Sequence, residues 1–327
     1  MSLKAQQEMT LEEALQLLAQ SRQIQWSFPT SQGRPVKWDA PEDWVREIVG
    51  KKQAIVEAAR FLVDYGEYDM AMELAANAWR LWILSRDIEQ GRQFLAEVLD
   101  KSTNNISRAR SLALYGAGLL AFRRGRLEES EKRNQEALAI AEQTKDLEGL
   151  GLAHLGLSRI AFEQRDFERA QSHAVKAREL LKGLAPEYGQ APLFLHAQSV
   201  RMLRDYESAS SLFEQSLALN RRIEDKGMVM AELTNLGRVE VHCGNADIAE
   251  QYFNEAEKIA GTSDTFDIAM NLVNKAALAF LRGDPSTAQS LLHRSKTPLT
   301  ESGIELGPDD KYDIDWLTQK IEENSQT

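Results

Sequence analysis

The stretch FRRGRLEESEKRNQEALAIAEQ, residues 122–143, decides the fold because related stretches return along the chain at a nearly constant interval. Each copy has a turn with arginine or glycine, followed by a helix-like run with a small residue in its first turn. Aligned on that residue, the six copies are separated by 39, 40, 39, 40 and 39 residues, at Gly91, Ser130, Ala170, Ala209, Ala249 and Ala288. A period of this length indicates a solenoid, in which each repeat packs only on its neighbours.

Each repeat is expected to be a pair of helices, because the chain of 327 residues has only 8 prolines and 19 glycines and is rich in good helix formers. The first helices are expected near 67–84, 106–124, 147–164, 188–204, 227–243 and 265–282. The second helices are expected near 88–100, 127–144, 167–182, 206–223, 246–260 and 285–295. These pairs predict an all-α fold, a solenoid of antiparallel helix pairs.

One position in the turn of each pair ends the first helix. Glycine, which adopts left-handed backbone at little cost, occupies it at Gly125, Gly244 and Gly283. Arginine stands at the equivalent position in other repeats, at Arg86, Arg165 and Arg204. These arginines are expected to adopt the same left-handed backbone with some strain.

The repeats divide the chain into three parts. Residues 66–295 hold about six helix pairs. After Ser295 the pattern stops, and residues 296–327 are expected to form a loop and a capping helix at 309–323. Residues 1–65 precede the repeats and are expected to form the other cap.

The expected N-terminal cap has two segments. Residues 10–21 have one apolar stripe, and Thr10 and Glu13 have capping-box spacing, so a short amphipathic helix is predicted. Residues 24–38 alternate aromatic and apolar side chains around a Pro/Gly turn, which favours a small β-hairpin that covers the end of the solenoid. An aromatic arm that grips a ligand and an irregular loop are the alternatives for this segment.

The paired helices, glycine turns and recurring alanines resemble tetratricopeptide repeats, in a form longer than the standard repeat of about 34 residues. The resemblance implies an all-α, right-handed superhelical solenoid of antiparallel helix pairs. Residues 66–99 also resemble the start of the helical array that follows the ATPase in STAND-class regulators, including LuxR-type transcription activators. The residues that carry this second resemblance are Leu74, Ala75, Trp79, Trp82, Glu89, Gly91, Arg92 and Leu95. Arg86 replaces the glycine that is usual in that pattern. The sequence shows neither a G-x-x-x-x-G-K-[ST] motif nor a DNA-reading helix-turn-helix, so the resemblance implies a sensor array without the ATPase or the DNA-binding domain.

The charge and the cysteine content exclude several classes of function. The chain has 39 Lys and Arg against 50 Asp and Glu, a net charge of −11, which opposes direct binding of nucleic acid. One cysteine rules out an internal disulfide framework and fits a reducing compartment. Neither an N-terminal signal segment nor a membrane-spanning apolar run is recognisable. We therefore expect a cytoplasmic protein without a membrane partner.

No residue pattern predicts chemistry. The five histidines, His154, His173, His196, His242 and His293, are not spaced as metal ligands on a helix. Cys243 is expected to be buried and inert, because nothing near it in the sequence would lower its pKa. We expect no catalytic residue, no cofactor and no metal, and we therefore do not expect an enzyme.

Residues at equivalent repeat positions identify a candidate surface. In tetratricopeptide arrays the first helices line the concave side, so equivalent side chains form columns along a groove. Arginines there can bind carboxylates, and asparagine amides can bind an extended peptide backbone. The candidate partner-binding residues are Arg159, Phe194, Gln198, Arg201, Asn235, Arg238 and Asn274. An ordinary solvated inner face is the alternative interpretation of these residues.

The sequence therefore favours a non-catalytic scaffold that binds a protein or peptide in bacterial signalling or regulation. The alternative is a sensor module for a small-molecule effector, as the resemblance to signalling ATPases suggests. The third hypothesis is that the chain is an enzyme. Self-association through the Trp-rich N-terminus is compatible with the first two.

Overall fold

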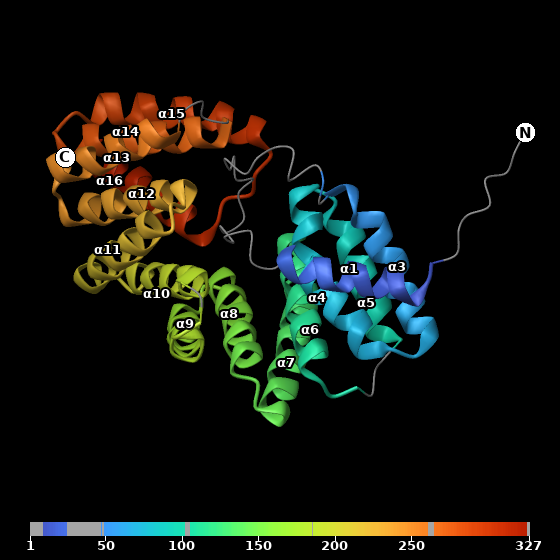
Figure 1. The fold of residues 1–327 in the computed structure, drawn as a ribbon. Helices are drawn as coiled ribbons and strands as arrows, with labels where there is room; N and C mark the ends of the chain where they lie inside the picture. The colour runs from blue at the N-terminus through green and yellow to red at the C-terminus, as the bar shows by residue number, and fades with distance from the viewer. Residues whose placement is uncertain are drawn as a thin grey trace, which may run out of the picture. The chain divides into compact units, whose positions relative to one another are not determined.

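The computed structural model describes residues 9–24, 47, 49–101, 105–184, 186–260 and 265–325 (Figure 1). Within these residues the regular elements are helices, and no β-strand occurs. The α-helices are α1 (Leu11–Ile24), α3 (Lys52–Tyr65), α4 (Tyr68–Leu84), α5 (Ile88–Asp100), α6 (Arg108–Arg123), α7 (Leu127–Thr144), α8 (Leu147–Glu163), α9 (Phe167–Leu181), α10 (Gln190–Met202), α11 (Tyr206–Arg222), α12 (Lys226–Cys243), α13 (Ala246–Ala260), α14 (Thr265–Leu281), α15 (Pro285–Ser302) and α16 (Pro308–Ser325). A short 3-10 helix, η1 (Pro186–Gly189), precedes α10. The prediction of an all-α solenoid of antiparallel helix pairs is confirmed.

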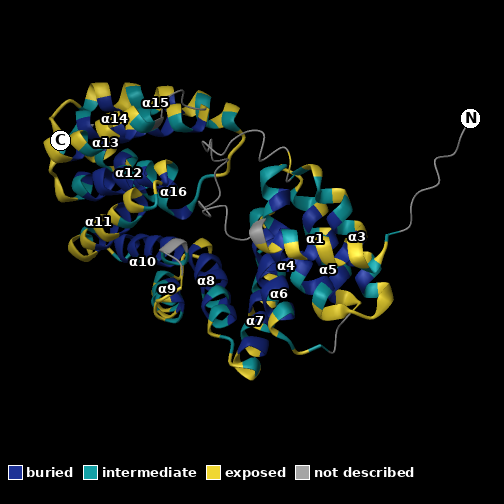
Figure 2. Ribbon diagram, in the orientation of Figure 1, coloured by how far each residue is buried: buried dark blue, intermediate teal, exposed yellow. Residues whose placement is uncertain are grey.

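The helices belong to two compact units. The first comprises residues 1–160 and 173–184, and the second comprises residues 161–172 and 185–327. Helices α8 and α9 each contribute to both units. Buried residues run along the helices of each unit, which therefore has a hydrophobic core of its own (Figure 2).

The core of the first unit shows why each repeat needs a small residue. A Cβ added at Gly91 of α5 would lie 2.4 Å from Cγ of Trp82 on α4, so the two helices approach as closely as glycine permits. The Trp82 ring in turn stacks on Phe94, with ring centroids 4.9 Å apart. In the next pair Ser130 is buried and its Oγ donates to the carbonyl of Gly118 at 2.8 Å. The recurring small residues therefore set the spacing of the helix pairs.

The core of the second unit is built around aromatic rings between α10 and α13. Phe213 of α11 is fully buried, and Phe194 of α10 packs edge-on against it with centroids 6.3 Å apart. A Cβ added at Gly237 of α12 would lie 2.4 Å from Cε1 of Phe253 on α13. Close packing of large rings against glycine positions fixes the orientation of the first helices, and with it the direction of their polar side chains.

The turns between paired helices have the predicted left-handed backbone. Gly125, Gly244 and Gly283 have φ values of 70°, 82° and 79°. The arginines at the equivalent positions, Arg86, Arg165 and Arg204, have φ values of 59°, 61° and 65°. An L-residue adopts this conformation at a cost, so the arginine turns are strained as predicted.

Helix α15 differs from the sequence-based prediction. It continues to Ser302, through Pro298, so the loop that was expected from residue 296 begins only at Gly303. Pro298 removes one backbone donor. Leu292 and Leu299 of this helix pack against the buried cluster that contains Phe266 and Met270 of α14. This tertiary packing overrides the local effect of the proline.

The N-terminal helix begins as predicted. The carboxylate of Glu13 accepts a hydrogen bond from the Thr10 backbone N–H at 2.9 Å, and the Glu13 N–H donates to Thr10 Oγ1 at 3.2 Å. These two bonds are the reciprocal bonds of a capping box. The hairpin predicted at 24–38 lies outside the described residues, apart from Ile24 at the end of α1.

Candidate recognition surface of the second unit

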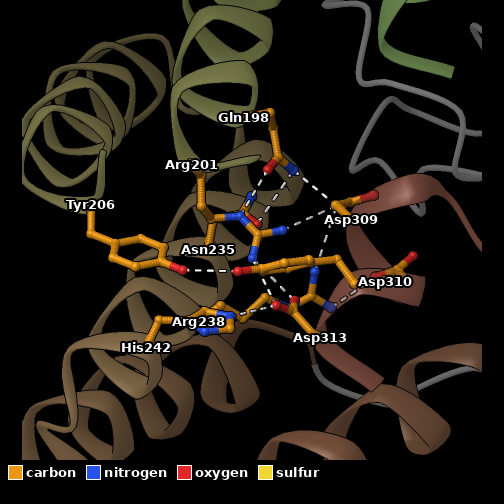
Figure 3. Close-up of polar contacts among 10 residues, drawn as sticks. Gln198, Arg201, Tyr206, Asn235, Arg238, His242, Asp309, Asp310 and Asp313 are labelled. Carbon is orange, nitrogen blue, oxygen red and sulfur yellow. Dashed lines mark hydrogen bonds and ion pairs between the residues drawn. The ribbon is translucent and has the colours of Figure 1, made fainter. Parts of the chain in front are cut away.

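Five polar side chains on two successive first helices form the candidate site (Figure 3). They are Gln198 and Arg201 of α10 and Asn235, Arg238 and His242 of α12, and they are called the arginine cluster below. Helical spacing places the members of each helix on one face. Arg201 is fully buried and Arg238 is 5% exposed, so both guanidinium groups need partners inside the protein.

The partners come from the first turns of α16, which carry three aspartates toward the arginine cluster (Figure 3). Arg201 Nη1 donates to both carboxylate oxygens of Asp313, at 2.9 and 3.1 Å. Arg238 Nη2 donates to Asp310 Oδ1 at 2.9 Å. Asp309 is less well matched, because its Oδ2 lies 3.6 Å from Arg238 Nη1 and 3.8 Å from Arg201 Nη2.

The two amides contact each other, and Gln198 connects Arg201 to α16. Gln198 Oε1 accepts a hydrogen bond from Arg201 Nε at 3.2 Å. Its Nε2 donates to Asp309 Oδ2 at 3.0 Å and, more weakly, to Asn235 Oδ1 at 3.4 Å. Gln198 therefore orients one arginine and one aspartate at the same time.

Aromatic rings surround His242 beside the charged groups. The imidazole stacks on Tyr206 with ring planes only 4° apart, and its centroid lies 5.1 Å from that of Tyr312 and 4.7 Å from that of Trp316. Its Nε2 lies 2.9 Å from Asp313 Oδ1, and the hydroxyls of Tyr206 and Tyr312 are 2.9 Å apart. The site therefore combines charged side chains with the flat faces of aromatic rings.

The aspartates differ in how well the site stabilises their charge. Burial alone would raise the pKa of Asp313, but Arg201 and His242 hold it well below its usual range. For Asp309, burial and the adjacent Asp310 raise the pKa above its usual value. Asp313 is therefore the best-paired carboxylate of α16, whereas the negative charge of Asp309 is disfavoured by its surroundings.

Two guanidinium nitrogens remain unsatisfied. Among the described residues, Arg201 Nη2 and Arg238 Nε are buried and have no hydrogen-bond partner. Arg238 Nε lies 3.4 Å from Asp313 Oδ2 without forming a hydrogen bond. Buried donors without an acceptor are unfavourable, so α16 satisfies the arginine cluster only in part.

The structure brings together four of the residues predicted from the sequence, Gln198, Arg201, Asn235 and Arg238. Phe194 is buried in the core against Phe213 and takes no part in the polar network. Asn274 is buried on α14. Among the described residues, the hydrogen bonds from other helices to Asp309, Asp310 and Asp313 come from Gln198, Arg201, Arg238 and His242, without Asn274. Arg159 belongs to the first unit, where its Nη1 donates to Tyr115 Oη at 3.1 Å.

The residues of α16 that complete the site were not predicted as site residues, because this helix was expected only to cap the repeats. The missed residues are Asp309, Asp310, Tyr312, Asp313 and Trp316. One signal was available. Three aspartates fall near the start of a predicted helix, and Asp313 is i+4 from Asp309 and i+3 from Asp310, so it neighbours both on the helix surface. The candidate surface contains arginines, which such a group of carboxylates could bind.

Polar groups outside the arginine cluster bear on the other predictions. Within the described residues, no group of three or more His, Cys, Asp or Glu side chains could hold a metal ion. His154 and His173 meet with their Nδ1 atoms 2.8 Å apart, a pairing that their sequence separation did not suggest. The prediction that Cys243 is buried is wrong, because it is exposed where α12 ends at the Gly244 turn. None of the described helices is long and apolar enough to span a membrane.

Comparisons with known proteins agree with this architecture. Residues 109–183 match the family model of the tetratricopeptide repeat. No curated protein matches the sequence. The structure of a Rap protein complexed with Competence and Sporulation Factor is 15% identical, with a TM-score of 0.56 over 79% of this chain and 77% of that one.

Two structures of NprR resemble this chain about as closely as the Rap structure does. NprR in complex with its cognate peptide NprX is 17% identical, with a TM-score of 0.52 over 79% of this chain and 76% of that one. The apo quorum sensor NprR from B. thuringiensis is 15% identical, with a TM-score of 0.55 over 85% of this chain and 78% of that one. At these identities the likeness shows the fold. The chain is built from tetratricopeptide-like helical repeats.

Proposed function

We propose that this protein is a non-catalytic scaffold that recognises an acidic protein or peptide segment through the first helices of its repeats. The observation that carries the proposal is the pairing of two buried arginines, Arg201 and Arg238, with three carboxylates of a helix. A guanidinium held in a buried site selects for carboxylates, because a neutral ligand would leave its charge uncompensated. The surface is therefore suited to acidic segments in particular.

The similar structures support this proposal. The Rap structure contains Competence and Sporulation Factor, and one NprR structure contains the cognate peptide NprX. We extend the proposal to bacterial signalling, in line with the resemblance of residues 66–99 to STAND-class regulators. A cytoplasmic location belongs to the same proposal.

The remaining predicted residues have separate proposed roles. Asn274 lies 39 residues after Asn235 and is the proposed next polar contact along the same row of first helices. Arg159, with its bond to Tyr115, is the proposed anion contact of the first unit. Phe194 acts indirectly, because its packing fixes the orientation of α10.

A peptide selection tests the proposed function. Random 16-residue peptides displayed on phage are selected against the full-length protein and, in parallel, against Arg201→Gln/Arg238→Gln. Acidic sequences with aromatic residues are expected to be enriched on the wild type and to lose that enrichment on the double variant. Arg221→Gln is the matched control, because Arg221 pairs with Glu255 on the exposed surface of the same unit.

Two results count against the proposal: no enrichment of acidic sequences, or the same enrichment on the double variant. Circular dichroism spectra of each variant establish that it is folded before selection. Arg238→Lys, which keeps the charge and loses the planar fork, is expected to give an intermediate enrichment.

A further inference from the structure

We propose that α16 is an internal ligand of the arginine cluster, and that the external partner is a helix of the same chemistry that docks there by displacing α16. This proposal rests on the proposed function. It adds the class of the partner, an amphipathic helix whose first turns are acidic and whose docking face also carries aromatic and aliphatic side chains. It also adds the way in which access to the surface is controlled.

The partner class follows from three kinds of contact that α16 makes. Its first turns place three aspartates on the arginine cluster. Tyr312, between two of these aspartates, and Trp316 pack against the imidazole of His242. Further along the helix, Leu317 and Ile321 are buried in the cluster that contains Val241 and Leu278. A competing helix must supply the same three kinds of contact at matching positions.

Displacement is favoured by the incomplete match between α16 and the arginines. Arg201 Nη2 and Arg238 Nε are buried, and α16 offers neither of them a hydrogen bond. The nearest Asp309 oxygen stops 3.8 Å from Arg201 Nη2. A partner with a longer acidic side chain at that position could reach this nitrogen, and would then satisfy a group that α16 leaves unsatisfied.

The covalent connection explains why an imperfect helix still covers the surface. Only residues 303–307 separate α15 from α16. Gly303, the first of them, has a φ of 62° and ends α15, and Gly307 is the last. So short a connection keeps α16 at a high effective concentration, and a free helix must therefore bind more tightly than α16 does to replace it.

The distribution of charge on the chain directs an acidic helix to the arginine cluster. The chain has a net charge of −11, so an acidic helix is repelled by most of the molecule. Within the second unit, removal of α16 would expose the guanidiniums of Arg201 and Arg238 on neighbouring helices. The uncovered arginine cluster is thus a cationic surface on an acidic protein.

A labelled peptide tests the proposal directly. The probe is a fluorescein-labelled peptide with residues 305–325, and binding to the full-length chain is followed by fluorescence anisotropy. The variant Asp310→Asn/Asp313→Asn loosens α16, and it is expected to bind the probe about tenfold or more tightly than the wild type, because more of its molecules are uncovered. Asp315→Asn is the matched control, since it removes one charge from an exposed position of α16 and is expected to bind the probe as the wild type does.

The outcomes separate this proposal from the proposed function. Tighter binding to the loosened variant, lost again when Arg238→Gln is added, supports both. Equal binding by the wild type and the loosened variant overturns the role of α16 and leaves the proposed function standing. Absence of binding to either protein, or binding that Arg238→Gln does not change, overturns both.

A second measurement needs no variant and remains decisive if the loosened chain fails to fold. Hydrogen exchange of the wild-type chain is followed by mass spectrometry while an isotope-labelled copy of the same peptide is added in excess. Displacement predicts that amides of the chain's own α16 exchange faster, while those of α12 do not. If α16 stays equally protected at saturating peptide, it is a fixed structural helix and the proposal is wrong.

Discussion

Arg201 and Asp313 are 112 residues apart in the sequence, and the Arg201 guanidinium contacts the Asp313 carboxylate at 2.9 Å in a largely buried site. The side chain of Arg201 is 0% exposed and that of Asp313 is 11% exposed. A buried ion pair contributes little net stability when both partners are present, but it is costly to break on one side. The pair therefore determines where α16 docks more than how stable the protein is.

Arg201→Met tests this difference. The substitution removes the bidentate partner of Asp313 and leaves its buried charge only partly compensated by Arg238 and His242, and we expect a loss of about 3–5 kcal/mol in the free energy of unfolding. Arg201→Met/Asp313→Leu removes both charges and is expected to recover most of this loss. The free energies come from urea titrations of the full-length chain followed by circular dichroism.

The control for this prediction is an exposed pair of the same type. Arg221 lies 2.6 Å from Glu255, with side chains 52% and 48% exposed. Arg221→Met is expected to cost less than about 1 kcal/mol. If Arg201→Met costs no more than Arg221→Met, the buried pair does not have the role given to it here.

The fold was largely predictable from the sequence because the repeat imposes it. The spacing of the small residues identified the helix pairs, and the turn positions identified Arg86, Arg165 and Arg204 as left-handed. The extension of α15 through Pro298 was not predictable, since it depends on packing against α14. Local propensity is a weak guide wherever tertiary contacts compete with it.

Only the part of the site on the first helices of the repeats was predictable; the contribution of α16 was not. Equivalent repeat positions place Gln198, Arg201 and Arg238 on one face, because helices in register present equivalent side chains together. The contact with α16 joins segments more than 100 residues apart, as in the pair of Arg201 with Asp313. No repeat relates those two segments. Complementary charge was the available signal, and charge alone does not specify geometry.

Glu232 predicts a dependence of stability on pH. It is fully buried on α12, where burial raises the pKa of its carboxyl to about 8 from an ordinary value of 4.5. The folded chain therefore holds this proton at pH values where the unfolded chain has lost it. The stabilisation is fully present below about pH 4.5 and is lost as the pH rises to about 8. Asp225 faces the same site, and burial raises its pKa as well.

The substitution Glu232→Gln tests this prediction. The amide keeps an oxygen that can accept from Ser216, as the Glu232 carboxylate does, and it carries no charge at any pH. We expect the wild type to lose on the order of 2–4 kcal/mol between pH 5 and pH 8.5, and the variant to lose much less. Melting temperatures at the two pH values measure the difference. Glu214→Gln, at an exposed position of α11, is expected to behave as the wild type; equal pH dependence in all three proteins would contradict the assignment.

Gly91 tests the role of the small residue in the repeat. A methyl group at this position would lie 2.4 Å from Trp82 Cγ, and the Trp82 ring is held by its stack on Phe94. Gly91→Ala is therefore expected to destabilise the chain by about 1–3 kcal/mol through overpacking. Gly50→Ala is the control, since nothing lies within 4 Å of the added carbon there. The role assigned to Gly91 is wrong if both substitutions have the same effect on the melting temperature.

Arg165 tests the strain in the arginine turns. Its φ of 61° places an L-residue where the equivalent repeats have glycine, as at Gly125 with a φ of 70°. Arg165→Gly relieves the left-handed conformation but adds flexibility to the unfolded chain, so a net gain of about 0.5–1 kcal/mol is expected. Arg165→Ala is the matched control, because it removes the same side chain and keeps the strain. Thermal melts of the three proteins decide the question: the glycine variant must melt above the alanine variant, since only the backbone conformation separates them. If the two variants melt together, the turn stores no strain, and arginine occupies this position without cost.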